Sequence, residues 1–489
     1  MVTGRYVIGW KNDDFIIYRD GAVVFEGDTI TYVGKASEYQ GSVDEVIDSG
    51  NSIVSPGLID LNALGDVDHH LIFSDFPQDR RNHLQWSMDY FDNRRKEDMS
   101  AEDEAFKSLY AYTNLIMNGV TTAMPITSTI DKKAGETYEE MVAAAEHAQD
   151  LGLRVYLGPS FLQGKHVCDP HTDEKLVRFF PDEESEQQLA NAERFIQEFE
   201  GAANDLIRTC VVPERIELQT EYSIRRSKEI AQRYKVPIRM HATQGIFEYD
   251  HIMAKTGLSP VKYLDSLGFF DDGAILPHGF AASGYSKIAD QSDDDLDILR
   301  DRGVSVLHCP IVFARMGIGL ESFGRYIRHG INMCMGTDTW PADILENCKT
   351  GSLIARILDD NRRENYFDYF FKAATIGGAK ALGRDDIGRL APGCKADIVI
   401  FDQSRSEYGI QDDPIQSLFN NGYGMMVSTS IINGRVVMRD RQLPGINQDQ
   451  LLARAQLVYD HMKASYKERS STPDAPDKDF FHTTFPIDY

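Results

Sequence analysis

A chain of 489 residues is longer than the usual single domain, so we expect one large domain with a smaller one beside it. Hydrophobic residues at 42% and charged residues at 26% are the balance of an ordinary globular protein. The 51 basic and 76 acidic side chains give a net charge of −25, which repels phosphates and anionic lipid, so we expect no nucleic-acid or membrane partner.

The sequence also indicates in which cellular compartment to expect the protein. Residues Met1 to Trp10 lack a basic segment followed by an apolar one, so no signal peptide is predicted. No run of about 18 apolar residues predicts a membrane span. The six cysteines form no Cys-x-x-Cys pair, which argues against a disulfide framework and a zinc finger. We therefore expect a cytoplasmic protein.

Short alternating segments separated by turn residues predict strands at both ends of the chain. At the N-terminal end these are Tyr6–Ile8, Phe15–Tyr18, Ala22–Phe25, Ile30–Val33 and Ser52–Val54. At the C-terminal end they are Asp397–Phe401, Val427–Ile432 and Arg435–Met438, the last two joined by an Asn-Gly turn. Because both ends are rich in strands, we expect one small β-sandwich domain built from residues 1–55 and 386–445.

The middle of the chain, residues 56–385, alternates apolar strands with helical patterns such as Glu139–Leu151, Asp182–Glu198 and Ser227–Tyr234. The predicted strands are Leu58–Leu61, Thr121–Pro125, Arg154–Gly158, Arg215–Thr220, Ile238–His241, Ile275–His278, Val304–His308 and Ile331–Gly336. Eight such units over about 330 residues predict an α/β fold of the (β/α)₈ TIM-barrel type. A doubly wound sheet is the alternative.

Two further segments stand apart from this pattern. The polar, aromatic-rich stretch from Asp75 to Ser100 contains His83, Trp86, Tyr90 and Phe91, and it either forms a lid or packs against the barrel. Residues 446–489 contain one predicted amphipathic helix, Gln448–Tyr466, followed by a polar tail that either wraps a neighbouring subunit or has no fixed structure.

Several predicted barrel strands end in a side chain that can bind metal or carry protons. These side chains are His241, His278, His308 and Asp338, at the ends of the last four strands. A lone histidine is more often a hydrogen-bonded core residue, but four successive strand ends change that expectation. Since a barrel places its chemistry there, two imidazoles and a carboxylate predict a divalent-ion site with an open position for water. The carboxylate can then take a proton from that water.

Motifs in the same order support this interpretation. The first set is Pro56-Gly57-Leu58-Ile59-Asp60, His241-Ala242-Thr243-Gln244, Leu276-Pro277-His278-Gly279, His308-Cys309-Pro310 and Gly336-Thr337-Asp338-Thr339. The second is Ala373-Ala374-Thr375, Ala379-Lys380-Ala381-Leu382-Gly383, Ile387-Gly388-Arg389-Leu390, Lys395-Ala396-Asp397-Ile398-Val399 and Ile432-Asn433-Gly434-Arg435-Val436-Val437. Through these motifs the chain resembles the amidohydrolase superfamily, in the branch of aminohydrolases and chlorohydrolases. The resemblance implies a barrel, a composite β-sandwich and a metal at the strand ends.

The chain departs from that family at two places. Members usually carry His-x-His after the first strand, where this chain has Asn62 and Leu64, and deaminases of the branch carry a glutamate where it has Gln244. The resemblance then implies a mononuclear site of His241, His278 and Asp338, with Asn62 as a weak fourth ligand. The expected ion is Zn²⁺, with Fe²⁺, Co²⁺ or Mn²⁺ as alternatives. The segment Asn62 to His69, with Arg315, also looks like a side branch of phenylurea and molinate hydrolases.

Other residues have open roles. His69 and His70 either replace the missing ligands or belong to a polar loop, and His308 either contacts substrate or water or supports the strand end beside Pro310. Trp340 either lines the substrate pocket or packs under a helix. We expect Gln244 and Arg315 to bind substrate, and His278 and Asp338 to serve in catalysis.

Three functions follow from these residues. The first is hydrolysis of an amide, urea or carbamate C–N bond of a small molecule by metal-activated water. The second is a deaminase or dechlorinase of an aminoheterocycle of the triazine, purine or pyrimidine type. The third is a metal-free scaffold, which the loss of the strand-one histidines suggests. Barrels of this kind commonly assemble, so we also expect a homo-oligomer.

Overall fold

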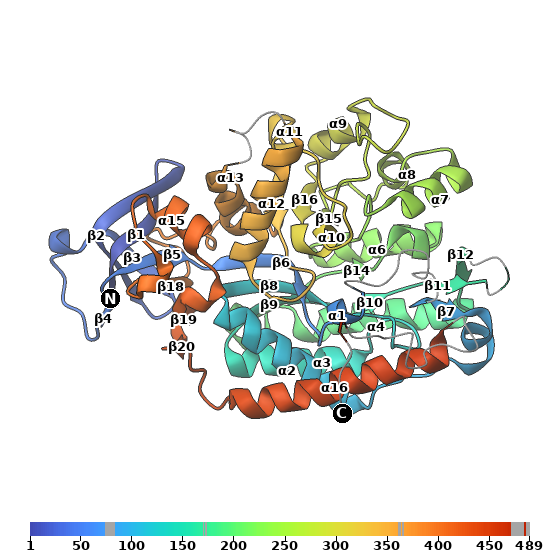
Figure 1. Ribbon diagram of the computed structural model, residues 1–489, viewed down its shortest axis with the longest axis horizontal. Coiled ribbons are helices and arrows are strands. Elements are labelled where there is room, and N and C mark those ends of the chain that lie inside the picture. The colour runs from blue at the N-terminus through green and yellow to red at the C-terminus, as the bar shows by residue number, and fades with distance from the viewer. Residues whose placement is uncertain are drawn as a thin grey trace.

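The computed structural model describes residues 1–73, 84–169, 171, 174–359, 363, 366–470 and 484–485 (Figure 1). His83 and His482 lie outside these described residues. In this described part of the chain, no helix has both the length and the apolar character needed to cross a membrane.

Strands from both ends of the chain share one sheet of eight strands (Figure 1). Its order is β20-β19-β18-β5-β1-β2-β3, with β4 also pairing with β1. The bounds are β1 Val2–Lys11, β2 Asp14–Glu26, β3 Thr29–Lys35, β4 Ile47–Asp48, β5 Ser52–Pro56, β18 Ile398–Asp402, β19 Val427–Ile432 and β20 Arg435–Arg439. The predicted strand segments fall within these strands except that β18 begins one residue after Asp397, and Phe15–Tyr18 and Ala22–Phe25 belong to the single strand β2. Buried Val7, Ile398 and Ile431 pack together in the core of this part.

The middle of the chain forms parallel strands. One ladder has the order β13-β9-β8-β6 and the other β15-β16-β17. Their bounds are β6 Leu58–Leu64, β8 Val120–Ile126, β9 Arg154–Leu157, β13 Ile207–Thr209, β15 Ile275–Pro277, β16 Ser305–His308 and β17 Asn332–Met335. Isolated parallel bridges join Val211 to Ile238 and Arg239 to Ile275, so the two ladders are linked through the 238–242 segment.

The prediction of a strand at Arg215–Thr220 is wrong. The strand segments here are β13 and the short β14, Val212–Pro213, and Ile216–Leu218 is instead a turn of 3-10 helix. Thr220 then starts helix α6, Glu221–Tyr234, since its hydroxyl accepts a hydrogen bond from the Ser223 N–H. The alternation of polar and apolar residues that predicted a strand is also produced by a helical turn leading into this cap. Residues 238–242 likewise pair through isolated bridges rather than a continuous ladder.

Helices surround the parallel strands (Figure 1). The longer ones are α2 Ala101–Met117, α3 Tyr138–Leu151, α4 Asp182–Phe199, α6, α7 Ile246–Thr256, α8 Pro260–Ser266, α9 Asp294–Asp301, α12 Ile344–Leu358 and α15 Pro414–Asn421. The shorter ones are α1 His70–Phe73, α5 Ala202–Asp205, α10 Pro310–Ala314, α11 Phe323–Arg328, α13 Phe367–Lys372 and α14 Gly378–Ala381. The predicted C-terminal helix is α16, Gln448–Arg469, and its buried Val458 and Met462 pack with Val67 and Met99.

The stretch predicted as a lid or as packing joins a small sheet. Its strand β7, Trp86–Ser87, pairs with β11, Gly164–Cys168, which also pairs with β12, Lys175–Phe179. Another short pair joins β10, Ser160–Phe161, to β14. Tyr90 and Phe91 are buried in a cluster with Trp86, so this part of the stretch packs. Trp86 also lines the main cavity, which places the insertion beside the site.

Candidate metal and substrate site

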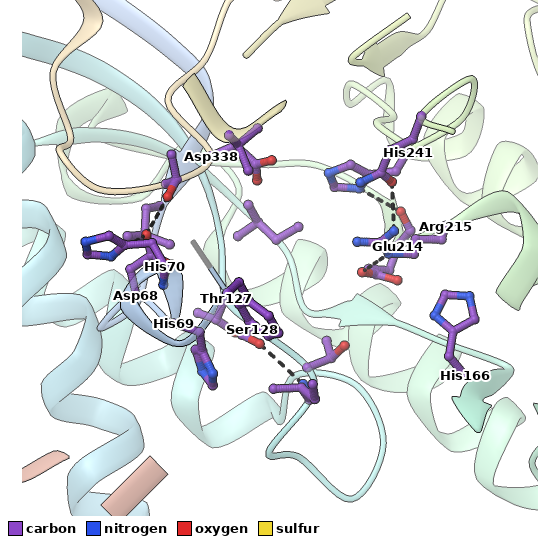
Figure 2. A pocket seen from close by; sticks show the side chains of 18 of the residues that line it. Asp68, His69, His70, Thr127, Ser128, His166, Glu214, Arg215, His241 and Asp338 are labelled. Carbon is purple, nitrogen blue, oxygen red and sulfur yellow. Dashed lines mark hydrogen bonds and ion pairs between the residues drawn. The ribbon is translucent and has the colours of Figure 1, made fainter. Parts of the chain in front are cut away.

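The cavity that concerns function lies at the carboxyl ends of the parallel strands and has a volume of about 430 Å³ (Figure 2). Loops after four of these strands supply its polar lining. These residues are Asp68, His69 and His70 after β6, Thr127–Thr129 after β8, Glu214 and Arg215 after β14, and Asp338 and Thr339 after β17. His241 and Gln244 line it from the 238–244 segment. The cavity is large enough for a small organic molecule.

His241 lines this cavity, and one of its ring nitrogens is already hydrogen-bonded. Its Nδ1 is 2.8 Å from the backbone carbonyl of Glu214, which accepts a hydrogen bond from the N–H form of that nitrogen. This leaves Nε2 as the lone-pair nitrogen, 3.5 Å from Nδ2 of Asn62. A carbonyl on the second nitrogen is the usual arrangement of a histidine that binds metal.

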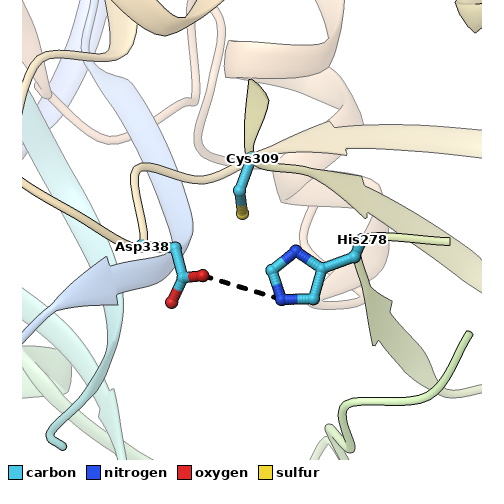
Figure 3. Close-up of side chains that lie close together, drawn as sticks. All are labelled: His278, Cys309 and Asp338. Carbon is cyan, nitrogen blue, oxygen red and sulfur yellow. Dashed lines mark ion pairs between the residues drawn. The ribbon is translucent and has the colours of Figure 1, made fainter. Parts of the chain in front are cut away.

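His278, Cys309 and Asp338 form a compact group (Figure 3), of which Asp338 lines the cavity. One possible ligand atom of each lies within 4.8 Å of the others, and Nε2 of His278 is 3.6 Å from Oδ2 of Asp338. The ring of His278 lies 5.2 Å from that of His241, centroid to centroid. Imidazole, thiolate and carboxylate are all ligands that Zn²⁺ accepts.

Two of these residues adopt unusual backbone conformations. His278 has φ of 79° and Asp338 has φ of 54°, both in the left-handed region that side chains rarely occupy. The Asp338 N–H donates to the carbonyl of Asn62 at 2.9 Å, which ties the end of β17 to β6. Asp60 adds a second link, because its carboxylate accepts hydrogen bonds from the Thr337 hydroxyl at 2.7 Å and the Thr337 N–H at 3.2 Å. Strain of this kind persists where surrounding contacts fix the conformation.

Unpartnered polar atoms gather at the same place. Among the described residues, both ring nitrogens of His278 and Oδ1 of Asn62 are buried without a hydrogen-bond partner. Buried polar groups are nearly always paired, so such atoms need an explanation. A cation bound by Asp338, by one ring nitrogen of His278 and by Oδ1 of Asn62 would satisfy two of these three atoms, and the residues present therefore fit a divalent ion.

Burial shifts the pKa of each titratable group here. It raises the pKa of Asp338 to about 7, although the nearby Arg215 guanidinium acts in the opposite direction. It lowers the pKa of both His241 and His278 well below the usual range, so both rings are neutral at pH 7. Neutral imidazole is the form that binds metal.

Gln244, predicted to bind substrate, lines the cavity but is already engaged. Its Oε1 accepts a hydrogen bond from Nη1 of Arg215 at 2.8 Å. Glu248, on α7, is buried, and its carboxylate accepts the N–H groups of Thr243 and Gln244 at 2.6 and 2.9 Å. Glu248 therefore orients this loop, and neither side chain offers a free acid to the cavity.

Of the other predicted site residues, Arg315 lines the cavity, whereas His308 and Trp340 do not appear in its described lining. Arg315 donates to the Thr339 hydroxyl and the Trp340 carbonyl at 2.9 and 2.6 Å. The Trp340 ring stacks on Tyr110 of α2, with centroids 5.5 Å apart. The buried His308 ring lies beside Phe323 and Phe370.

His69 and His70 line the cavity but stand outside the compact group. Nδ1 of His69 is 2.8 Å from the Tyr466 hydroxyl of α16, and Nδ1 of His70 is 3.1 Å from Asp68. Asp68 in turn accepts hydrogen bonds from the Thr339 hydroxyl and the Trp340 N–H, both at 2.6 Å. These contacts connect the loop after β6 to the one after β17.

Sequence reasoning missed several residues of the site. Cys309 belongs to the His308-Cys309-Pro310 motif, but the sequence predicts no role for it as a ligand. The sequence predicts no role for Asp68 either, although Asp68 lines the cavity. Lys165 and Lys175 line the cavity from the β11–β12 hairpin, which no sequence pattern had pointed to.

Two curated relatives align with most of this chain. A 5'-deoxyadenosine deaminase from Methanosarcina mazei is 25% identical over 425 residues, which cover 86% of this chain and 89% of the relative. A 5-methylthioadenosine/S-adenosylhomocysteine deaminase from Acetivibrio thermocellus is 25% identical over 415 residues, covering 83% and 86%. The alignments therefore extend over nearly the whole of each protein.

Solved structures have the same fold. A zinc-bound adenosine deaminase from Xanthomonas campestris superposes with a TM-score of 0.77 at 18% identity, covering 95% of this chain and 98% of that one. A zinc-bound atrazine chlorohydrolase from Arthrobacter aurescens superposes with a TM-score of 0.73 at 19% identity, covering 94% and 100%. These likenesses imply an α/β fold of the TIM-barrel type.

The predicted family is confirmed at the level of the whole chain. Residues 53–437 match the model of the amidohydrolase family, a span that contains His241, His278 and Asp338 together with most of the motifs that suggested the resemblance. The chain belongs to the amidohydrolase family.

Proposed function

We propose that this protein is a metal-dependent hydrolase that cleaves a C–N bond at a carbonyl-like carbon of a small molecule. The observation that carries the proposal is that neutral His241 and the Asp338 carboxylate line the cavity while neutral His278, with its unpartnered nitrogens, lies beside both of them. Hydrolytic C–N cleavage also agrees with the relatives, which are named as deaminases.

The proposed ligands are His241, His278 and Asp338, with Asn62 and Cys309 as further donors. Nitrogen, oxygen and sulfur donors together favour Zn²⁺ among the divalent ions. When bound, such an ion would lower the pKa of a water molecule and polarise the bond to be broken.

Asp338 is the residue that moves the proton in this proposal. Its carboxylate can accept a proton from the attacking water and release it to the leaving nitrogen. Its left-handed backbone and the hydrogen bond to Asn62 hold it at the cavity. Nε2 of His278 lies 3.6 Å from Oδ2 of Asp338, so the two side chains can bind the same ion.

We favour an amide, urea or carbamate as the substrate because Gln244 stands where deaminases of the branch carry a glutamate that protonates a ring nitrogen. Gln244 cannot give up a proton, and the Glu248 carboxylate is occupied by two backbone N–H groups. An acyclic leaving amine needs only the proton that Asp338 returns. Gln244 and Arg315 would then position the substrate.

Deamination or dechlorination of an aminoheterocycle is the second candidate. Its support is the activity of the relatives, which are named as deaminases of adenine nucleosides, and of a structural neighbour named as an atrazine chlorohydrolase. In that case Asp338 would have to carry the proton that Gln244 cannot.

The test combines metal quantification with a substrate panel. Protein purified without chelator should contain about one equivalent of metal and turn over one class among N-acyl, urea, carbamate and aminoheterocycle compounds. An amine plus carboxylate or CO₂ identifies the first candidate, and ammonia with an intact ring identifies the second. Asp338→Asn should lose at least about a thousandfold in kcat/KM. Asp301→Asn, a change of the same kind on an exposed carboxylate, should retain full activity.

Protein with well under one equivalent of metal and no turnover of any class would instead support the metal-free scaffold. Full activity of Asp338→Asn would remove this residue from the mechanism while leaving the family assignment intact. The two results are separable because metal content is measured independently of activity.

We also propose how the chain is divided into domains. The linked ladders from β6 to β17 would close as an eight-stranded barrel over residues 56–385, and the terminal sheet would form a β-sandwich from residues 1–55 and 386–445. Residues 446–489 would form a separate C-terminal segment. We also propose a cytoplasmic homo-oligomer, which light scattering of the purified protein tests.

A further inference from the structure

Basic side chains line one side of the cavity. Lys165 on β11 and Lys175 on β12 line it, together with Arg215. In Figure 2, Arg215 and the neighbouring His166 lie across the cavity from Asp68 and His70. The β11–β12 hairpin thus forms a wall whose charges the proposed reaction does not use.

The carboxylates near this wall are partly matched already. Glu214 accepts a hydrogen bond from Nε of Arg215 at 3.0 Å, so these two charges compensate each other. Glu217 is buried, with Oε1 3.2 Å from Nε2 of His166. These contacts leave Lys165 and Lys175 without a carboxylate in direct contact among the described residues.

Lys165 is the strongest part of the argument. It is only 5% exposed, and its ammonium donates to the backbone carbonyl of Thr129 and lies 4.8 Å from the centre of the Trp86 ring. Within the described part of the chain, no carboxylate lies within 4.0 Å of its Nζ. Burial lowers the pKa of this lysine to about 7. A buried ammonium without a counter-charge is costly unless something supplies one.

Lys175 is a second lysine of this wall that lies against an aromatic ring. Its Nζ lies 4.3 Å from the centre of the Phe247 ring, and no described carboxylate lies within 4.0 Å of it. Cross-strand partners share a face of a sheet, and Lys175 is paired with Cys168, so the two lysines leave opposite faces of the hairpin. They reach the cavity at different points and make the wall basic over some length.

This wall contrasts with the protein as a whole. The net charge of −25 repels small anions from the surface in general. Two lysines without carboxylate partners inside a cavity of such a protein are therefore difficult to explain by solubility or by general surface charge. They are the groups that recognise a carboxylate.

We propose that the substrate carries an anionic group, a carboxylate in its simplest form, which Lys165 binds while the scissile bond lies at Asp338, with Lys175 adding positive charge at a second point of the same wall. This inference rests on the proposed function, since it names the substrate class of that same cavity. The inference predicts that the enzyme prefers an amide, urea or carbamate that carries an acidic group over a neutral one.

Binding can be tested without turnover by using two aryl ketones that contain no C–N bond. Zinc-loaded protein is titrated calorimetrically with 4-acetylbenzoate and with acetophenone, which differ only in the carboxylate. The expected preference for 4-acetylbenzoate is about tenfold or more, the range of a charge-assisted hydrogen bond. It should fall at least tenfold in the Lys165→Met/Lys175→Met double variant. Lys287→Met removes one exposed positive charge elsewhere and should leave the preference unchanged.

The preference ratio separates recognition from a merely structural role. If the lysines only stabilised the fold, the double variant would weaken both ketones equally and keep the ratio. Equal binding of the two ketones by the unaltered protein, or a ratio that survives in the double variant, overturns the inference. If instead the proposed function is wrong, the protein will turn over no compound of the substrate panel but will still prefer 4-acetylbenzoate to acetophenone.

Discussion

At the scale of single residues, the site depends on groups that burial keeps in an unusual state. His278 has two buried nitrogens without described partners, and Asp338 has a carboxyl whose pKa is raised to about 7. Both adopt left-handed backbone conformations, which cost of order 1–3 kcal/mol each. A protein retains such features where they serve binding or chemistry, and here they occur together.

Lys165 gives a prediction about pH. Its pKa in the folded protein is about 7, below the value of about 10.4 in an unfolded chain. Between these values the unfolded state binds more protons, so the free energy of unfolding must rise with pH over this window. Below pH 7 both states are protonated and the gain is absent. Lys165→Met removes this contribution.

The measurement compares urea unfolding of the unaltered protein and Lys165→Met at pH 6.5 and pH 9. The unaltered protein should gain about 1 kcal/mol or more relative to the variant on going to pH 9. Lys287→Met, an exposed lysine, should show no such relative change. A difference between the proteins that stays constant with pH would show that the pKa of Lys165 is not lowered.

At the scale of elements, the short 238–242 segment is held by side-chain contacts as well as by its few bridges. Arg239 is fully buried, and its Nη1 donates to the carbonyls of Leu61 and Met124 at 2.8 and 2.7 Å. Its Nη2 donates to Pro125 at 3.1 Å. One guanidinium therefore fixes this segment against β6 and β8 and places His241 at the cavity.

Replacing Arg239 should accordingly destabilise the protein. Arg239→Met leaves three buried carbonyls without this donor, and we expect a loss of about 3 kcal/mol in the free energy of unfolding, measured by urea denaturation. Arg208→Met, which removes a half-exposed arginine paired with Glu200, should cost less than about 1 kcal/mol. Equal effects of the two substitutions would contradict the role given to Arg239.

At the scale of the whole molecule, the site joins parts that are distant in the chain. The loop after β6 reaches α16 through His69 and Tyr466, and β6 reaches the end of β17 through Asp60 and Thr337. A bound ion would add another connection between strands, and any ligand that binds only the folded state stabilises it.

Metal removal should therefore lower the melting temperature. Chelator-treated protein should melt several degrees below protein reloaded with Zn²⁺, and the difference should grow with the Zn²⁺ concentration. The shift should shrink in His278→Ala, which lacks a proposed ligand. An unchanged melting temperature after complete removal of bound metal would argue against an ion held between these strands.

The sequence by itself determined the family, the strand-rich ends and most of the central strands. Alternation and turn residues are local signals, so segments such as those of β1, β18 and β19 could be read directly. The motifs placed His241, His278 and Asp338 at strand ends for the same reason. Local alternation also explains the error at Arg215–Thr220, since a helical turn followed by the Thr220 cap gives the same pattern.

Only the tertiary structure decided which side chains share the cavity. Cys309 joins His278 and Asp338, and Trp340 turns to Tyr110, because packing between distant elements fixes where each side chain points. Lys165 and Lys175 come to the cavity on a hairpin whose position depends on pairing with β7, almost 80 residues earlier in the chain. Such convergence depends on contacts between segments, and a single sequence holds no local signal for it.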